Sequence, residues 1–254
     1  MPEIIMLLNI LFFTFLASIV SLFLVAILLA KEKFMHRISF SLVSFAAGAL
    51  LATGFLDTMK EAIALDRENA FIWITIAFAA FFIVERLFIF IHHHGEENPE
   101  AEKEEMRLPT PFLLFGDGMH NFIDGISIAT SFLVSFPLGL VTTTAVFVHE
   151  IPHELGDFGI LIHKGYSRKK VLGFNFLTGV AAIAGAILAY YVGNAFEHLI
   201  PVFLSITTAN FIYLSATDLL PEIHIKAKRA LALNETAFFL LGILLIWGLI
   251  KMLG

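Results

Sequence analysis

The sequence predicts an all-α polytopic membrane protein with eight transmembrane helices. Its 254 residues are 58% hydrophobic and only 15% charged, and the mean hydropathy is +0.86. Soluble domains carry about 25% charged residues, so this deficit places the chain in the membrane class. Eight apolar segments follow one another, each close to the roughly 20 residues with which a helix crosses about 30 Å of hydrocarbon. The segments are residues 4–30, 38–61, 70–91, 110–134, 139–163, 171–193, 201–220 and 235–253.

The fourth and fifth segments are the most polar of the eight, and hydropathy alone would score them low. Their small residues and the loops that flank them still favour two membrane spans. The chain has no cysteine, which excludes disulfides, thiolate metal ligands and a cysteine nucleophile. It also has no P-loop pattern, so we expect no nucleotide-driven reaction.

Basic residues indicate how the spans are oriented. Twelve of the 16 Lys and Arg residues fall in the four odd-numbered connections, three fall on the opposite side, and Arg86 lies within a span. Because Lys and Arg accumulate in cytoplasmic loops, we expect the odd-numbered connections in the cytoplasm and both termini outside it. The opposite side carries Lys60, Arg67 and Lys251.

One long polar linker, residues 92–109, separates the third span from the fourth. It begins with His92-His93-His94 and continues with Glu and Lys residues, a composition typical of flexible segments. We expect a flexible cytoplasmic loop whose histidines either bind metal loosely or form an exposed polar tract. The linker does not divide the chain, because neither half alone would bury the polar spans, so residues 1–254 are predicted to form a single transmembrane domain.

A short internal sequence repeat, which we call the internal echo, relates the second span to the seventh. Asp57 is followed by Glu61, and Asp218 by Glu222, each near the end of a span. The two spans run in opposite directions, and inverted repeats of this kind are common in transporters. We therefore expect an inverted-repeat-like bundle of 3+2+3 helices. Capping or interhelical hydrogen bonding explains both aspartates equally well.

The side chains that could bind a metal ion are concentrated on spans four and five. His120 and Asp124 are four residues apart and share one helix face, and His149 and His153 have the same spacing on the next span. Ionisable groups in hydrocarbon are unfavourable by several kcal/mol unless they are paired or coordinated, although a lone histidine is often only hydrogen-bonded. Three histidines with carboxylates at helical spacing instead predict a four-ligand site for Zn²⁺ or a related ion.

Further polar residues adjoin these four. Asn121, Glu150 and Glu154 are predicted either to complete a neighbouring metal site or to orient the ligands by hydrogen bonds. Pro152 removes a backbone N–H, from which we expect a broken helix that lines a wet or ion-filled path.

The segment His149-Glu150-Ile151-Pro152-His153 also fits the H-E-x-x-H pattern of zinc metalloproteases, in which the glutamate is the general base. An intramembrane zinc metalloprotease is therefore the alternative hypothesis. Pro152, however, disturbs the helix that must aim both imidazoles, and the preceding span supplies a second ligand set that a protease does not need. Transport of a metal ion accounts for both sets, since the ion must be bound and also released.

These features resemble those of the ZIP family of divalent-metal transporters. The resemblance rests on the eight spans, the histidine-bearing loop after the third span, the segment His120-Asn121-Phe122-Ile123-Asp124-Gly125, and the segment from His149 to Asp157. The last segment is similar to the LIV-1 branch pattern H-E-x-P-H-E-x-G-D, with every fixed position present. The resemblance covers nearly the whole chain.

The resemblance implies a transmembrane transporter domain that takes zinc into the cytoplasm as its transported substrate, with iron, manganese or cadmium as alternatives. It implies an elevator-like movement of one helix bundle against another and a paired metal site. The primary site would use His120, Asp124, His149 and His153, and the neighbouring site Asn121 and Glu150.

One part of the family pattern is not matched. Near the end of the second span the family commonly has a histidine and then Pro-Glu, where this chain has Asp57 and then Lys60-Glu61, so the outer metal relay is not carried over. The large extracellular domain of many animal members has no counterpart, from which we expect a prokaryotic inner (plasma) membrane protein. The expected partners are divalent metal ions and the lipid bilayer, with no nucleic acid, and a homodimer is left open.

Overall fold

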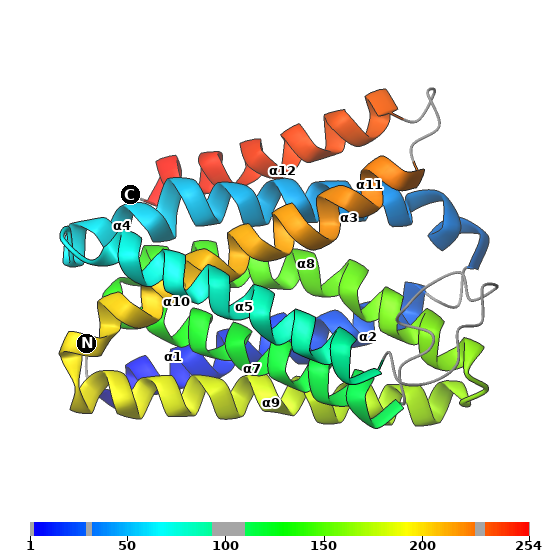
Figure 1. Cartoon of the computed structure of the whole chain (residues 1–254), viewed down its shortest axis with the longest axis horizontal. Coiled ribbons are helices and arrows are strands. Elements are labelled where there is room, and N and C mark those ends of the chain that lie inside the picture. Colours follow the sequence, from blue (N-terminus) through cyan, green and yellow to red (C-terminus); the bar gives the residue numbers. More distant parts are fainter. Residues whose placement is uncertain (1–2, 29–31, 93–109, 227–231, 254) are drawn as a thin grey trace.

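The computed structural model describes residues 3–28, 32–92, 110–226 and 232–253, which are helical apart from short turns. Within these residues the helices form eight spans, which confirms the predicted all-α polytopic fold (Figure 1). The predicted flexible linker 92–109 lies outside the described residues except for His92, the last residue of its helix. The spans are α1 (Glu3–Phe15) with α2 (Ser21–Leu28), α3 (Glu32–Thr53) with α4 (Met59–Leu65), α5 (Ala70–His92), α7 (Thr110–Val134), α8 (Phe136–His163), α9 (Arg168–Ala195), α10 (Ile200–Tyr213) with α11 (Leu220–Lys226), and α12 (Ala232–Leu253).

Six of the eight spans are long and apolar enough to cross a membrane by length and composition. The other two, α7 and α8, have 25 and 28 residues. At 1.5 Å per residue these helices are about 38 and 42 Å long, which exceeds the hydrocarbon thickness of about 30 Å. They fall short in hydropathy because they carry the polar side chains that the other spans surround.

Two features of α8 differ from the sequence prediction. The helix begins at Phe136 rather than at residue 139, because Ser135 caps it by accepting a hydrogen bond from the Leu138 amide at 3.3 Å. The expected break at Pro152 is wrong, since α8 is helical on both sides of this residue. Pro152 has no amide hydrogen to donate to the Val148 carbonyl, but membrane helices tolerate this loss where neighbouring helices pack around the site.

In the part of the chain that the structure describes, three spans contain a π-helical segment, in which the backbone hydrogen bonds reach one residue further. Leu16–Val20 joins α1 to α2, Gly54–Thr58 joins α3 to α4, and Leu214–Leu219 joins α10 to α11. The last two contain Asp57 and Asp218, the aspartates of the internal echo. Each packs on the other span, Gly54–Thr58 against α10 and Leu214–Leu219 against α3. This reciprocal packing agrees with the inverted-repeat-like arrangement.

The spans pack as two groups of four. The α7 bundle contains α1–α2, α7, α8 and α9, and the α3 bundle contains α3–α4, α5, α10–α11 and α12. The bundles meet where α3 packs on α8 and α7 packs on α10. The two contacts are equivalent under the inverted repeat. If the second span is exchanged with the seventh and the fourth with the fifth, the α3–α8 contact becomes the α10–α7 contact. Figure 1 shows α9 and α12 at opposite edges of the molecule, with the start of α1 and the end of α12 at the same end.

Large apolar side chains cover the outside of the molecule. On α1, for example, Ile4, Leu8 and Phe12 recur every four residues and are exposed, so they form one continuous face. Exposed apolar surface of this extent is incompatible with water but matches the acyl chains of a bilayer. The protein is therefore an integral membrane protein.

Glycine allows α7 and α9 to approach each other closely. A Cβ atom at Gly125 would overlap the Ala182 carbonyl of α9, and one at Gly185 would overlap the Phe122 carbonyl of α7. Close backbone approach through small residues is a major source of helix association in membranes. The contact fixes α7, and with it His120, against α9.

We predict that Gly125→Ala lowers the melting temperature of the purified protein in detergent. The added methyl group must displace the α9 backbone, and overpacking of this kind costs about 1–3 kcal/mol. Gly116→Ala is the matched control on the same helix, because a Cβ there meets nothing within 4 Å and alanine has the higher helix propensity. Equal melting temperatures for the two variants would show that the α7–α9 contact is not tightly packed.

Candidate metal centre

Four ligand atoms converge between α7 and α8. They are Nε2 of His120 and Oδ2 of Asp124 on α7, and Nε2 of His149 and Oε1 of Glu150 on α8. All four residues offer an atom within 4.8 Å of the others. Asp124 and Glu150 are fully buried, and His149 is 3% exposed. We call these four residues the central group.

The spacing within the central group suits a tetrahedral metal ion. His149 Nε2 lies 3.0 Å from Asp124 Oδ2 and 3.2 Å from His120 Nε2. Glu150 Oε1 lies 3.3 Å from His120 Nε2 and 3.8 Å from His149 Nε2, and His120 Nε2 is 3.6 Å from Asp124 Oδ2. Nitrogen and oxygen ligands about 2.05 Å from a tetrahedral zinc ion lie roughly 3.3 Å from one another. An ion therefore fits among these atoms with little rearrangement.

His149 is oriented by its own helix. Its Nδ1 lies 3.0 Å from the Ala145 carbonyl oxygen, and because a carbonyl only accepts, Nδ1 carries the hydrogen and Nε2 of the neutral ring presents a lone pair. That lone pair faces Asp124 and His120, while the buried atoms Asp124 Oδ2 and Glu150 Oε1 have no hydrogen-bond partner. Buried acceptors that face one another repel unless a cation lies between them. The arrangement therefore favours a bound cation.

A second group of ligands lies beside the central group. His153 Nδ1 is 3.5 Å from Asp157 Oδ2 on the same helix and 3.9 Å from Asp117 Oδ1 on α7. We call Asp117, His153 and Asp157 the second group. The His153 ring stacks on that of His120, with centroids 4.3 Å apart, so the two groups adjoin. The resemblance placed His153 in the primary site, whereas here its Nδ1 is directed to Asp117 and Asp157.

Two of the predicted site residues lie next to these groups rather than in them. Asn121 donates through Nδ2 to Asp117 Oδ1 at 2.9 Å, and so orients a member of the second group. Glu154 accepts a hydrogen bond from Asn175 Nδ2 of α9 at 2.5 Å through Oε2. Both residues are buried, and both contacts are of the kind that orients ligands.

Sequence reasoning did not assign roles to several residues of this region. Asn210 of α10 donates through Nδ2 to Asp124 Oδ1 at 3.3 Å. A residue of the α3 bundle thereby orients a ligand that belongs to the α7 bundle. Asp117 and Asp157 are not among the predicted ligands either, although both lie beside His153 in the structure. An asparagine in an apolar span, such as Asn175 or Asn210, was the sequence signal that could have indicated these contacts, because a buried amide requires a hydrogen-bond partner.

The two ends of the site differ in access. Toward the end of α7, Ser131 and Thr142 are joined by a hydrogen bond of 2.9 Å, and Ile128 and Val141 are buried beside them. Toward the start of α7, the side chains of His153 and Asp157 are 27% and 22% exposed. The central group is thus closed toward the end of α7, whereas the neighbouring second group is more exposed.

Buried imidazoles and carboxylates between two central spans define the class of this protein as a metal-binding polytopic membrane protein. The family model described as ZIP Zinc transporter matches residues 93–250, which is more than half of the chain, and the chain belongs to this family. The resemblance inferred from the sequence is thereby confirmed.

Individual relatives agree with this assignment. Zinc transporter ZIP4 of Homo sapiens is 40% identical over 126 residues, which cover 49% of this chain and 19% of the relative. Zinc transporter ZIP10 of Danio rerio is 39% identical over 110 residues, covering 43% and 13%. Zinc transporter zipt-7.2 of Caenorhabditis elegans is 33% identical over 151 residues, covering 58% and 32%. The matched region thus spans less than a third of the length of each of these relatives.

We predict that Asn210→Ala weakens zinc binding by about tenfold or more, the usual effect of removing a residue that orients a metal ligand. Isothermal titration of the purified protein with Zn²⁺ measures this change. Asn194→Ala is the control, because the Asn194 side chain donates to the Tyr190 carbonyl of its own helix, and its removal leaves zinc affinity unchanged. An unaltered affinity in Asn210→Ala would rule out the orienting role.

Proposed function

We propose that this chain transports divalent transition-metal ions across a membrane, zinc first among them, through the site between α7 and α8. The observation that carries the proposal is the central group, in which four buried ligand atoms face one another at the spacing of a tetrahedral zinc site. In an interior sealed from water by apolar helices, such a set favours a divalent cation over an empty state.

The donor set supports zinc over harder ions. Two imidazoles and two carboxylates suit zinc, and nitrogen ligands favour it over manganese and iron, which have lower affinity in the Irving–Williams order. Magnesium and calcium prefer oxygen ligands throughout. Iron, manganese and cadmium are therefore secondary candidates as transported substrates.

The direction of transport follows from access and charge. The more exposed second group lies toward the end of the bundle that carries Lys164, Arg168, Lys169 and Lys170 (Figure 1). Positive residues favour the cytoplasm, so the basic end of the bundle is the cytoplasmic end and both termini lie outside. Because the more exposed second group lies toward this end, the structure supports release of the ion into the cytoplasm. The location in an inner (plasma) membrane stays a prediction.

The division into two bundles supports an elevator-like movement. All members of the central and second groups belong to α7 and α8, and therefore to the α7 bundle. A displacement of this bundle along the α3 bundle would carry the whole ligand set with it. The Asn210–Asp124 hydrogen bond joins a helix of each bundle, so this contact would change during such a movement.

The geometry does not favour the metalloprotease alternative. In an H-E-x-x-H protease both imidazoles bind the same zinc ion. Here His149 Nε2 faces Asp124 and His120, whereas His153 Nδ1 faces Asp117 and Asp157. The two histidines of the motif thus belong to different groups, and the family to which the chain belongs is one of transporters.

We predict that His149→Ala and Asp124→Asn each reduce zinc uptake into proteoliposomes to the level of protein-free vesicles, because each removes a ligand of the central group. A zinc-sensitive dye inside the vesicles measures the flux. The control is His198→Ala, because His198 lies at the end of the bundle in the short helix Glu197–Leu199, and its flux stays at the unmodified level.

Undiminished zinc flux in both central-group variants would contradict the proposed path. Cleavage of a membrane substrate that is lost in Glu150→Gln while zinc stays bound would instead establish the protease alternative.

A further inference from the structure

We propose that the lipid-facing surface at the start of α9 binds an anionic phospholipid, with Lys169 and Lys170 on the headgroup phosphate and the exposed apolar face of the helix on the acyl chains. The inference goes beyond the proposed transport function, because it assigns a ligand to the outer surface of the α7 bundle. It does not depend on which metal ion the protein carries.

Positive charge is concentrated at the turn between α8 and α9. Four cations fall within seven residues, at Lys164, Arg168, Lys169 and Lys170, and residues 158–196 contain no Asp or Glu. Lys169 and Lys170 are exposed, and neither forms an ion pair within the part of the chain that the structure describes. Uncompensated lysines at a membrane surface attract anionic headgroups.

The first turn of α9 lies at the level of the headgroups. The 28 residues of this helix extend for about 42 Å at 1.5 Å per residue, whereas the hydrocarbon layer is about 30 Å thick. The two ends of α9 therefore project beyond the hydrocarbon. Because the basic end of the bundle faces the cytoplasm, the ligand belongs to the cytoplasmic leaflet, which is the leaflet that carries anionic lipids.

Two aromatic rings hold the ammonium group of Lys170 in place. Its Nζ lies 4.8 Å from the centre of the Tyr166 ring and 5.6 Å from the centre of the Phe174 ring. The two rings meet edge to face, with their centres 5.6 Å apart, and both pack on a buried apolar cluster that contains Leu161. A cation–π contact orients the lysine without neutralising its charge, so less side-chain freedom is lost when an anion binds.

An open position lies one turn further along the same face of α9. Gly173 follows Lys169 by four residues and Lys170 by three, so the three residues share one face. Gly173 is exposed, and a Cβ atom there would meet nothing within 4 Å. The face continues with Phe176 and Leu177, which are 48% and 68% exposed. Cations, a gap and then apolar side chains match the order of phosphate, glycerol and acyl chains in a phospholipid.

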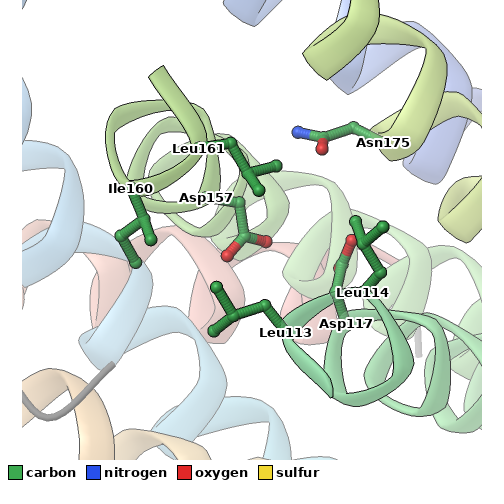
Figure 2. A pocket seen from close by; sticks show the side chains of 7 residues that line it. All are labelled: Leu113, Leu114, Asp117, Asp157, Ile160, Leu161 and Asn175. Atoms are coloured by element: carbon green, nitrogen blue, oxygen red, sulfur yellow. The ribbon is translucent and has the colours of Figure 1, made fainter. Parts of the chain in front are cut away.

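The lipid surface adjoins the exposed end of the metal region. The apolar cluster that supports the two rings includes Leu114 and Leu161. Figure 2 shows these two side chains around a small pocket, together with the carboxylates of Asp117 and Asp157. A lipid bound at the start of α9 therefore stabilises the packing of the helix ends that carry the second group.

The test measures retention of phosphatidylglycerol by the purified chain in detergent, using native mass spectrometry. We expect the double variant Lys169→Gln, Lys170→Gln to bind this lipid about thirtyfold more weakly, which corresponds to about 1 kcal/mol for each lysine. We expect no retention of phosphatidylcholine, which has no net charge, or of inorganic phosphate, which has no acyl chains. The double variant Arg67→Gln, Lys251→Gln is the matched control, because it removes the same charge from exposed residues at the other end of the molecule (Figure 1).

A change of shape without a change of charge distinguishes a defined site from diffuse attraction. Gly173→Leu fills the gap, and we expect it to abolish retention of phosphatidylglycerol. Gly248→Leu on α12 is its control, because this glycine is also exposed and a Cβ there also meets nothing within 4 Å. Melting temperatures of the lipid-free samples verify that each variant is folded.

Equal phosphatidylglycerol affinity in the unmodified chain and the folded Lys169→Gln, Lys170→Gln variant would overturn the proposal. Unaltered retention in folded Gly173→Leu would also overturn it, because only diffuse attraction by the lysines would then remain. Retention of inorganic phosphate or of phosphatidylcholine as strong as that of phosphatidylglycerol would show that the surface does not select an anionic lipid. None of these results would affect the proposed transport of zinc, which the flux measurements test separately.

Discussion

The structure depends on one electrostatic constraint, namely that acceptor atoms gathered in a nonpolar interior need a positive charge among them. Asp124 Oδ2 lies 3.0 Å from Nε2 of His149, whose neutral ring presents a lone pair there, and Glu150 Oε1 is buried nearby without a hydrogen-bond partner. In water such a cluster would be screened, but between apolar helices the repulsion is strong. Helix packing in the folded chain holds the acceptors together. Binding of a cation therefore relieves the repulsion, and its binding free energy is not spent on ordering the ligands.

The rest of the molecule can be understood as the frame that keeps these atoms in place. Gly125 and Gly185 bring α7 against α9, the Ala145 carbonyl fixes the His149 ring, and Asn210 reaches across from the other bundle to Asp124. The exposed apolar faces of the outer helices contact lipid and thereby separate the polar interior of the protein from water. Close packing of α7 on α9 and the Asn210–Asp124 hydrogen bond across the bundle boundary are compatible with a ligand set that moves as a unit.

The length and apolar character of the segments were sufficient to predict the eight spans, and helical spacing brought together three members of the central group, His120, Asp124 and His149. Spacing of four residues places His120 with Asp124 on one face of α7, and it requires no knowledge of the partner helix. Periodicity does not determine which face of α8 turns toward α7. For that reason Glu150 joins the central group while Glu154, one turn later, turns to Asn175 of α9.

The features that sequence reasoning missed depend on contacts between distant segments. A local rule predicted a break at Pro152, but packing keeps α8 helical there. The π-helical segments at Gly54–Thr58 and Leu214–Leu219 have no clear local signal, since each is stabilised by packing on the other span. Asn210 lies far from Asp124 in sequence, and only the fold brings the two together.

The most direct test of the central claim is an anomalous-scattering map of crystals of this chain grown with zinc and recorded on both sides of the zinc absorption edge. Our account predicts the strongest peak between the Nε2 atoms of His120 and His149, at about 2.0–2.1 Å from each. A map with ordered side chains at the central group and zinc peaks only elsewhere on the protein would contradict the account.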